Sequence, residues 1–384
     1  MRILPVLAIV ICAVASPRSN CSMAEEQRAP QKTRRILYNC DGCSCMFYKK
    51  DVYTPSEITQ DDLRAITDEL KQPESQVDTF LLCVNAQVLF YPSKVGTMIG
   101  SVMSADDRKG LPAHVQQWIV NLEGFHASGV DPYAVILAEA KKRGLETLIS
   151  YRMNDAHGNN FLLSAFHHEH PEYRLNGGLE FGQEPVRDYT FRIIEEIAQR
   201  YDCDGIELDF NRFPTYFSGG ESEERIATIN SLVERIRTMI EGESKRRNRR
   251  LVLAARVPTS YQQCQEIGLD PVAWANEGWI DFLTVSEFLF VRYDLPVKPW
   301  TEKVQPVPVY ASIECTEGSK LEQCLTAEKY RRASRHLWSD GADGIYLFNF
   351  FTTREWHDQS FEPPFEVLEE LGSLKTLELR EGSG

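Results

Sequence analysis

The chain has 384 residues, of which 42% are hydrophobic, and it carries a formal net charge of −14 at pH 7. This is the composition of a globular protein with enough length to bury a full core, so disorder is excluded as its main state. The strong negative charge argues against sequence-independent binding to phosphate backbones, and we expect no nucleic-acid partner. The basic run KRRNRR at residues 245–250 is interpreted as the solvated end of a helix.

The N-terminal segment has the features of a secretory signal peptide. Arg2 precedes an apolar run that closes on a small-x-small pattern at residues 13–15, and a second possible cleavage site follows Ala24. The run is shorter than the roughly 20 apolar residues of a membrane-spanning helix. We therefore expect a signal peptide at residues 1–24, a polar linker at residues 25–34, and export to the periplasm or the extracellular space. No stable membrane insertion is expected after the signal is removed.

Ten cysteines are consistent with export, because disulfides persist outside the cytosol. Cys315 and Cys324 flank the segment TEGSKLEQ and could close a loop. The cluster CDGCSC at residues 40–45 is open to two interpretations, which are disulfides with Cys83 or Cys203 and plain buried thiols. Both are favoured over a metal site, which needs a fourth ligand and reduced thiols. The pairing does not follow from the sequence.

Apolar runs alternate with helical patterns along the rest of the chain. The runs predict eight strands, at residues 35–40, 77–85, 145–154, 204–210, 251–257, 280–287, 307–314 and 344–350. The helical patterns lie at residues 59–71, 131–144, 186–201, 222–243, 270–278 and 327–341, with a closing helix at 365–374. The helix at 131–144 has Asp131 as its N-cap, Pro132 at its first position and Gly144 as its C-cap.

Strands separated mostly by helices imply parallel pairing through right-handed crossovers. Eight such units favour a single (β/α)8 TIM barrel at residues 35–372, followed by a C-terminal tail at residues 373–384. An open doubly wound sheet would also fit the alternation. No Gly-x-Gly-x-x-Gly follows the first strand, so a dinucleotide-binding fold lacks its fingerprint.

The fourth predicted strand, DGIELDF, places carboxylates between apolar residues. Strand side chains alternate between faces, so Ile206, Leu208 and Phe210 share one face while Glu207 and Asp209 share the other. The outer face of a barrel strand packs on helices, so we expect the acids to point inward. Active sites of this fold lie at the C-terminal ends of the strands, where Asp209 is expected.

Other predicted strands deliver polar groups to the same rim. Two carboxylates that flank a glycosidic bond can cleave it, because one protonates the leaving oxygen and the other attacks or activates water. We therefore assign Asp209 as nucleophile or base and Glu287 or Glu314 as the acid. The expected substrate-binding residues are Glu207, Arg152, Asn154, Asp155, His157, Arg212, Arg256, Tyr310, Asn349, Trp300 and Trp356.

The segment DGIELDFNRFP resembles the strand-four signature of the glycosyl-hydrolase-like 10 group and its bacterial relatives. The segments YRMNDAH, HPEY and GADGIYLFNF resemble parts of exported bacterial members, and the similarity covers about residues 35–370. The resemblance implies a (β/α)8 glycoside hydrolase fold with Asp209 at its site. Many retaining barrel glycosidases end strand four in Asn-Glu, whereas this chain has Leu208-Asp209, so Glu287 and Glu314 stay rival candidates for the acid.

These patterns favour an exported glycoside hydrolase that acts on a poly- or oligosaccharide without a cofactor. One alternative is a non-catalytic carbohydrate-binding protein on the same scaffold. Another is a metal-dependent hydrolase that uses the histidines of residues 167–170. Ligands so close together on a loop make a cramped site, and no His-Glu-x-x-His spacing occurs, so no metal ligand is assigned.

Overall fold

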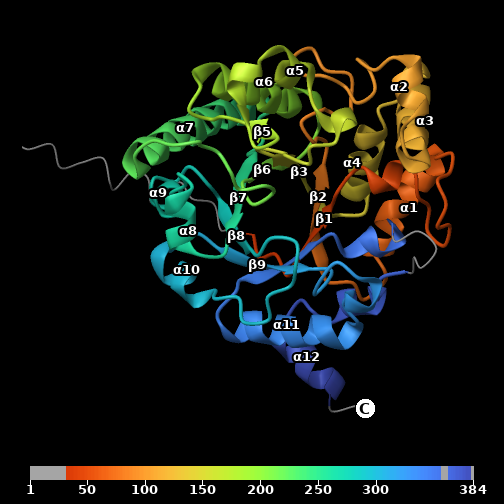
Figure 1. The fold of residues 1–384 in the computed structure, drawn as a ribbon. Coiled ribbons are helices and arrows are strands. Elements are labelled where there is room, and N and C mark those ends of the chain that lie inside the picture. The colour runs from red at the N-terminus through yellow and green to blue at the C-terminus, as the bar shows by residue number, and fades with distance from the viewer. Residues whose placement is uncertain (1–31, 356–361, 382–384) are drawn as a thin grey trace, which may run out of the picture. The chain divides into compact units, whose positions relative to one another are not determined.

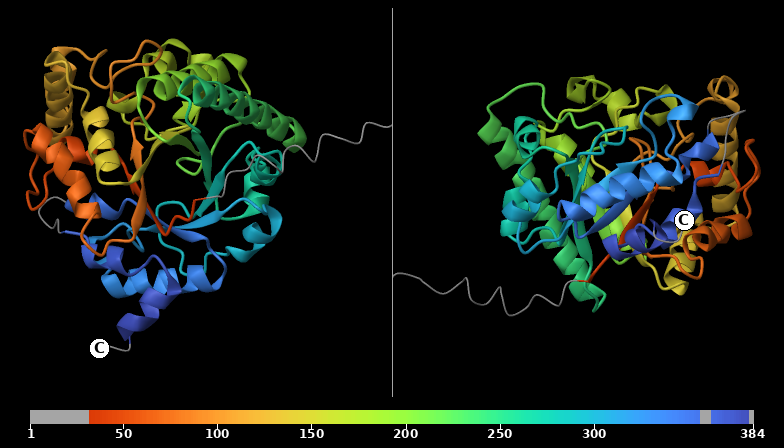
Figure 2. Two further views of the ribbon diagram at one scale, coloured as in Figure 1. Left: turned by 180° about the vertical axis from the view of Figure 1, so that it is seen from behind. Right: turned by 90° about the horizontal axis from the view of Figure 1, so that it is seen from below.

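The computed structural model describes residues 32–355 and 362–381. Within these residues, eight parallel strands close into a barrel in the order β1-β10-β9-β8-β7-β6-β3-β2. The strands occupy the middle of the fold, and the helices surround them in views from the front, from behind and from below (Figures 1 and 2). The predicted (β/α)8 fold is confirmed. The barrel and its helices belong to one compact unit that begins at Arg34.

Each barrel strand overlaps its predicted range, and its ends differ from the predicted ends by at most two residues. The strands are β1 (Ile36–Cys40), β2 (Val77–Cys83), β3 (Glu146–Arg152), β6 (Gly205–Asp209), β7 (Val252–Pro258), β8 (Phe282–Ser286), β9 (Val309–Glu314) and β10 (Gly344–Phe348). Two further short strands, β4 (Arg174–Leu175) and β5 (Gly178–Leu179), form an antiparallel pair in the connection that follows β3.

The longer helices are α1 (Gln60–Leu70), α3 (Ala113–Ala127), α4 (Pro132–Lys142), α6 (Glu184–Arg200), α7 (Ser222–Arg246), α11 (Ala327–Ser339) and α12 (Leu374–Glu381). The short ones are α2 (Ala105–Lys109), α5 (Ala165–Glu169), α8 (Tyr261–Glu266), α9 (Pro271–Asn276) and α10 (Lys298–Lys303), with 3-10 turns that include η1 (Ser44–Met46), η5 (Phe350–Glu355) and η7 (Phe365–Glu369). No helix in the described part of the chain is both long and apolar enough to cross a bilayer.

The ends of the predicted helices agree with the structure except at the C-terminus. Asp131 caps α4, where its side chain accepts from the N–H groups of Tyr133 and Ala134. The predicted closing helix at residues 365–374 is wrong. Residues Phe365–Glu369 form a 3-10 turn instead, and the next helix begins only at Leu374. Gly372 lies between them, and it is a poor helix former.

The barrel interior is filled by a small apolar layer, and an ion pair lies at its N-terminal end. The layer comprises Leu37, Leu81, Leu148, Ala254, Phe282, Tyr310, Tyr346 and Phe348. At the N-terminal end, the guanidinium of Arg34 donates to Glu146 at 2.6 Å, and Thr79 Oγ1 donates to the same carboxylate at 2.7 Å. The polar side chains that could take part in catalysis lie at the other, C-terminal end of the barrel.

Two glycines give a matched test of this packing. A Cβ at Gly344, the first residue of β10, would lie 2.2 Å from the carbonyl oxygen of Arg34 and 2.9 Å from the ring of Tyr310. We expect Gly344→Ala to lower the free energy of unfolding by about 1–3 kcal/mol in urea denaturation, because the buried strand must shift. Gly242→Ala, on an exposed position of α7 with no atom within 4 Å, should raise it by roughly 0.5–1 kcal/mol. Equal responses of the two variants would contradict this account.

Candidate active site

A buried arginine joins two of the predicted acids at the C-terminal end of the barrel. Arg256 on β7 donates through Nη1 to both oxygens of Asp209, at 3.2 and 3.1 Å, and through Nη2 to Glu314 Oε1 at 2.8 Å. All three side chains are at most 2% exposed. The guanidinium lies 3.8 Å from the ring centroid of Phe348 and also donates to Ser286 Oγ at 2.8 Å. One planar fork therefore holds the carboxyl groups of Asp209 and Glu314 on its two terminal nitrogens.

Glu314 lies at the end of β9. Burial raises the pKa of Glu314 to about 7, although the positive charges of Arg256 and Arg212 lower it. For Arg256, burial lowers the pKa, but the carboxylates of Asp209 and Glu314 raise it above its ordinary value. Near neutral pH the pair thus consists of a fixed cation and an acid that still holds its proton in part of the molecules.

Glu207 lies one layer deeper and faces inward, as expected. Its Oε1 accepts hydrogen bonds from Ser150 Oγ and from Tyr346 Oη, both at 2.8 Å, and Tyr346 Oη accepts from Asn39 at 2.8 Å. Its Oε2 has no partner among the described residues. Burial and then the charge of Asp209 raise the pKa of Glu207 to about 7. The charge of Arg256 lowers this pKa only in part, so a proton on the carboxyl removes a buried charge that has no ion-pair partner among the described residues.

The pKa of Glu207 sets an expected pH dependence of stability. A folded pKa above the ordinary 4.5 means that the folded chain keeps a proton that the unfolded chain releases, so stability falls as pH rises from about 4.5 through about 7. The fall from this one group is on the order of 3 kcal/mol. Urea midpoints at pH 5, 6, 7 and 8 should decline less steeply in Glu207→Gln, whereas Glu302→Gln, on an exposed side chain of α10, should keep the wild-type slope. Parallel slopes for all three proteins would show that Glu207 is not the titrating group.

Asp209 also shapes the loop that follows β6. Its Oδ1 accepts from the backbone N–H groups of Asn211 and Arg212, both at 3.0 Å. These bonds close a tight turn of the kind that Asp side chains favour. The turn carries Arg212 from the end of the strand to the rim.

A row of side chains at the rim is connected by ion pairs and hydrogen bonds. Arg152 pairs with Asp41 through Nη2 and with Asp155 through Nη1 at 3.2 Å. His157 Nδ1 lies 2.8 Å from Asp155 Oδ1, and His157 Nε2 lies 3.0 Å from Arg212 Nη2. A guanidinium can only donate, so Nε2 of His157 accepts and its Nδ1–H donates to Asp155. This assigns a neutral ring, in agreement with burial, which lowers the pKa of His157.

A cavity of about 600 Å³ is lined in part by these rim residues. Its lining combines polar residues, which are Asp41, Arg152, His157, Arg212, Thr316 and Asn349, with aromatic residues, which include Phe47, Tyr48, Phe90, Trp118 and Phe161. Asp209 and Glu314 are buried and do not line the cavity, but each adjoins a lining residue: Asp209 accepts from the backbone N–H of Arg212, and Glu314 directly precedes Cys315.

Of the predicted site residues, Arg152, His157, Arg212 and Asn349 line this cavity, whereas Glu287, Asn154, Tyr310 and Trp300 neither line it nor belong to the hydrogen-bonded groups around Arg256 and His157. Glu287 follows the inward-facing Ser286, so strand alternation turns it outward. Its side chain is 39% exposed and accepts from Thr259 Oγ1 at 3.2 Å. Asn154 is used within the loops, since its side chain bonds the backbone of Leu179 and Thr215.

Tyr310 and Trp300 lie away from the cavity, Tyr310 because it is too deep in the barrel and Trp300 because it is packed in the core. Tyr310 shares the face of Glu314 but lies in the apolar layer lower in the barrel, where its ring packs on Phe282 at 5.1 Å. Trp300 is 2% exposed in the core, and its Nε1 donates to the carbonyl oxygen of Thr259 at 2.6 Å. Neither ring offers a face to a sugar. Trp356 lies outside the described residues.

Sequence reasoning missed two groups at this site. Asp41 directly follows β1 and lines the cavity. The rule that functional residues of this fold lie at the C-terminal ends of the strands could therefore have identified it from the sequence. The aromatic residues of the lining come from η1, α3 and the connections after β2 and β3, which are long insertions. No periodic pattern marks such loops as neighbours, so this aromatic group was not predictable.

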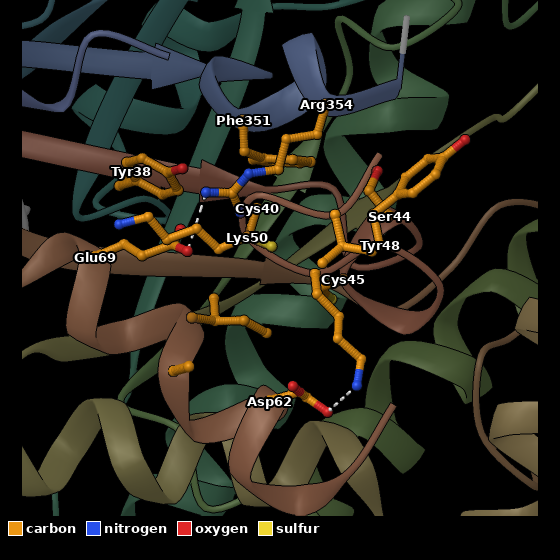
Figure 3. A pocket seen from close by; sticks show the side chains of 14 residues that line it. Tyr38, Cys40, Ser44, Cys45, Tyr48, Lys50, Asp62, Glu69, Phe351 and Arg354 are labelled. Atoms are coloured by element: carbon orange, nitrogen blue, oxygen red, sulfur yellow. Dashed lines mark ion pairs between the residues drawn. The ribbon is translucent and has the colours of Figure 1, made fainter. Parts of the chain in front are cut away.

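A smaller cavity of about 180 Å³ lies on the outer side of β1 (Figure 3). It is bounded by Tyr38 and Cys40 of the strand and by residues of α1, η5 and the loop after β1. Ion pairs join Glu69 to Arg354 at 3.0 Å and Lys49 to Asp62 at 2.9 Å. These four charged groups satisfy one another within the helical layer, so the cavity is not a candidate active site.

The histidine segment does not form a metal centre in the described part of the chain, where no group of three potential ligands comes together. His167 is part of the short helix α5, and burial lowers its pKa to about 4. The described cysteines form no disulfide. The segments that carry Cys315 and Cys324 pair through their backbones, because Leu325 N donates to the carbonyl oxygen of Cys315 at 2.9 Å and Thr316 forms an antiparallel bridge with Cys324.

The basic run at residues 245–250 ends α7, as expected, but it is more than a solvated helix end. Arg247 donates to the carbonyl oxygens of Ala198 and Tyr201 at the end of α6. Arg249 pairs with Asp202 at 2.6 Å, and Arg250 pairs with Asp281 at 2.5 Å. These arginines fasten the helix to its neighbours.

Comparison with solved structures places this architecture among known barrels. The PgaB (BpsB) glycoside hydrolase domain from Bordetella bronchiseptica has 13% sequence identity and a TM-score of 0.55, and the match covers 89% of this chain and 99% of that one. The barrel of this chain therefore has the same fold as that domain. Alpha-L-fucosidase isoenzyme 2 from Paenibacillus thiaminolyticus has 10% identity and a TM-score of 0.50, over 91% of this chain and 50% of that one. At these identities the likeness establishes the fold alone. No family model and no curated protein sequence matches the chain.

Proposed function

We propose that this protein is an exported glycoside hydrolase of the glycosyl-hydrolase-like 10 type that cleaves a glycosidic bond of a poly- or oligosaccharide. The observation that carries the proposal is the pair of carboxyl groups, Asp209 and Glu314, held by Arg256 next to residues that line a rim cavity. Glycosidic bond cleavage uses a pair of carboxyl groups that flank the bond, one as acid and the other as nucleophile or base. The glycoside hydrolase fold supports the same reaction class. Export rests on the signal-like residues 1–24, which lie outside the described residues.

The two acids have different environments, which supports different roles. Glu314, with a pKa of about 7, is suited to protonate the leaving oxygen near neutral pH. Asp209, bonded to Arg256, is the second carboxylate and acts as nucleophile or base. Glu287 is turned away and is not part of the pair. The aromatic residues of the cavity lining provide flat apolar faces against which sugar rings pack.

An activity screen on polysaccharides and aryl glycosides tests the proposal. The wild-type chain should release reducing sugar from at least one substrate, and Asp209→Asn should release none, because the amide can neither attack nor accept a proton. Circular dichroism and gel filtration establish whether the variant is folded. Undiminished turnover by a folded Asp209→Asn protein would rule out this role for Asp209.

One observation favours a second function, which is carbohydrate binding without cleavage. Both oxygens of Asp209 are already bonded, and neither acid lines the cavity itself. Under this alternative the wild-type protein binds an oligosaccharide in calorimetry but releases no product over long incubation. Cell fractionation followed by immunoblotting tests export independently of either function.

A further inference from the structure

Arg212 differs from the other two arginines of the site in its partners. Arg152 pairs with two carboxylates, and so does Arg256. Arg212 is 8% exposed and lines the cavity, but its side chain forms no ion pair with a carboxylate of the described residues. Its side-chain hydrogen bond goes to the neutral ring of His157, and its Nε has no partner within the same residues. The charges of Glu314 and Asp155 act on Arg212, but both carboxyl groups are already bonded to other side chains. A buried cation without a directly bonded anion is unfavourable, so such a group calls for an anionic partner.

The charges around the cavity agree with that requirement. Among the described residues that line it are two guanidinium groups, of Arg152 and Arg212, and one carboxylate, of Asp41. The two guanidinium groups are close enough to repel, since burial and then the charge of Arg212 lower the pKa of Arg152 to about 10. The cavity wall thus has an excess of positive charge in a chain of net charge −14. A bound anion would relieve the repulsion.

We propose that the cavity binds a carbohydrate that bears a carboxylate, and that Arg212 receives this carboxylate. The inference rests on the proposed function and names its substrate class, an acidic glycan such as a uronic-acid polymer. A planar guanidinium matches a carboxylate in two-point geometry. The aromatic residues of the cavity lining, which include Trp118 and Phe161, supply apolar surface for the sugar ring.

His157 and Asp155 are positioning residues in this arrangement. Asp155 accepts from His157 Nδ1, and His157 Nε2 then accepts from Arg212 Nη2, which fixes the plane of the guanidinium. The ring of Phe213, 5.2 Å from the guanidinium carbon, supports the same orientation.

The test is a calorimetric comparison of carboxylated and neutral forms of the same glycan. The full chain is titrated with oligogalacturonate and oligoglucuronate, with the methyl ester of each, and with a neutral and a sulfated oligosaccharide. The same titrations are run on Arg212→Gln, on Arg212→Lys and on Arg64→Gln, a control that removes an exposed guanidinium from α1. Thermal denaturation shows whether each variant is folded, and Arg212→Lys serves if the glutamine variant is not.

Wild type is expected to bind at least one carboxylated glycan 10-fold or more tightly than its methyl ester. Arg212→Gln should abolish this preference, Arg212→Lys should reduce it, and Arg64→Gln should retain it. Equal affinity for acid and ester, preference for the sulfated glycan, or a preference that persists in Arg212→Gln would overturn the inference. Cleavage or binding of neutral glycans alone would overturn it while leaving the proposed function standing, whereas absence of binding and turnover across the panel would overturn both.

Discussion

Glu314→Gln is expected to lower turnover by about 10²–10⁴-fold, the usual contribution of a general acid. Glutamine has the size of the protonated glutamate and can still accept from Arg256, which donates to Glu314 at 2.8 Å. It cannot supply a proton, so the loss should appear in kcat on substrates with poor leaving groups. Aryl glycosides with acidic phenols, which leave without protonation, should be affected least.

The pH profile gives this prediction a second readout. With a pKa of about 7, Glu314 loses its proton as pH rises, so wild-type kcat/KM should decline above about pH 7. The residual activity of Glu314→Gln should lack that decline. Glu302→Gln, at a side chain that is 65% exposed, is the matched control and should behave as wild type. An alkaline limb that survives in Glu314→Gln would assign the proton to another group.

Arg256→Met is expected to lower the free energy of unfolding by about 3–5 kcal/mol, as removal of one partner from a buried ion pair does. Methionine fills much of the same space against Phe348, but it leaves Asp209 without the cation that bonds both of its oxygens. The loss should be larger at pH 8 than at pH 6, because Glu314 becomes ionised over this interval and also lacks its partner. Urea denaturation monitored by tryptophan fluorescence measures both values.

Arg64→Met is the control for this second prediction. Arg64 pairs with Asp61 on the surface of α1, and its side chain is 44% exposed. Surface pairs contribute about 0–1 kcal/mol, so its loss should be small and should not depend on pH between 6 and 8. An Arg256→Met protein as stable as Arg64→Met would mean that the buried pair is not needed for the fold.

The fold was predictable because its signal is repeated and local. Strands such as LVLAARV and IDFLTVSE are short apolar runs, and each is followed by a helical pattern or a rim loop, so an error in one element leaves the others intact. The closing helix and α3, which no predicted element covers, were exceptions. The segment at residues 365–374 has helical periodicity, but Gly372 interrupts it and tertiary packing selects a 3-10 turn.

The candidate site was predictable only as far as strand alternation reaches. Alternation places Glu207, Asp209 and Glu314 inside the barrel, and the parallel register brings Asp209 opposite Arg256. Alternation does not tell how deep in the barrel a side chain lies, and this depth is what distinguishes Tyr310 from Glu314. Nor could it anticipate the long connections that bring Trp118 to the cavity, because these contacts depend on how the loops pack.

Closure of the barrel also brings the two ends of the folded unit together. Gly372 N donates to Gln76 Oε1 at 2.6 Å, and a Cβ at Gly372 would lie 3.0 Å from that of Arg35, at the entrance to β1. In a circular permutant, a linker from the end of α12 to the start of β1 would therefore need to span little more than the length of α12. This length is roughly 12 Å for its eight residues. New termini at the exposed turn of Gly129, between α3 and α4, would leave every strand of the barrel uncut.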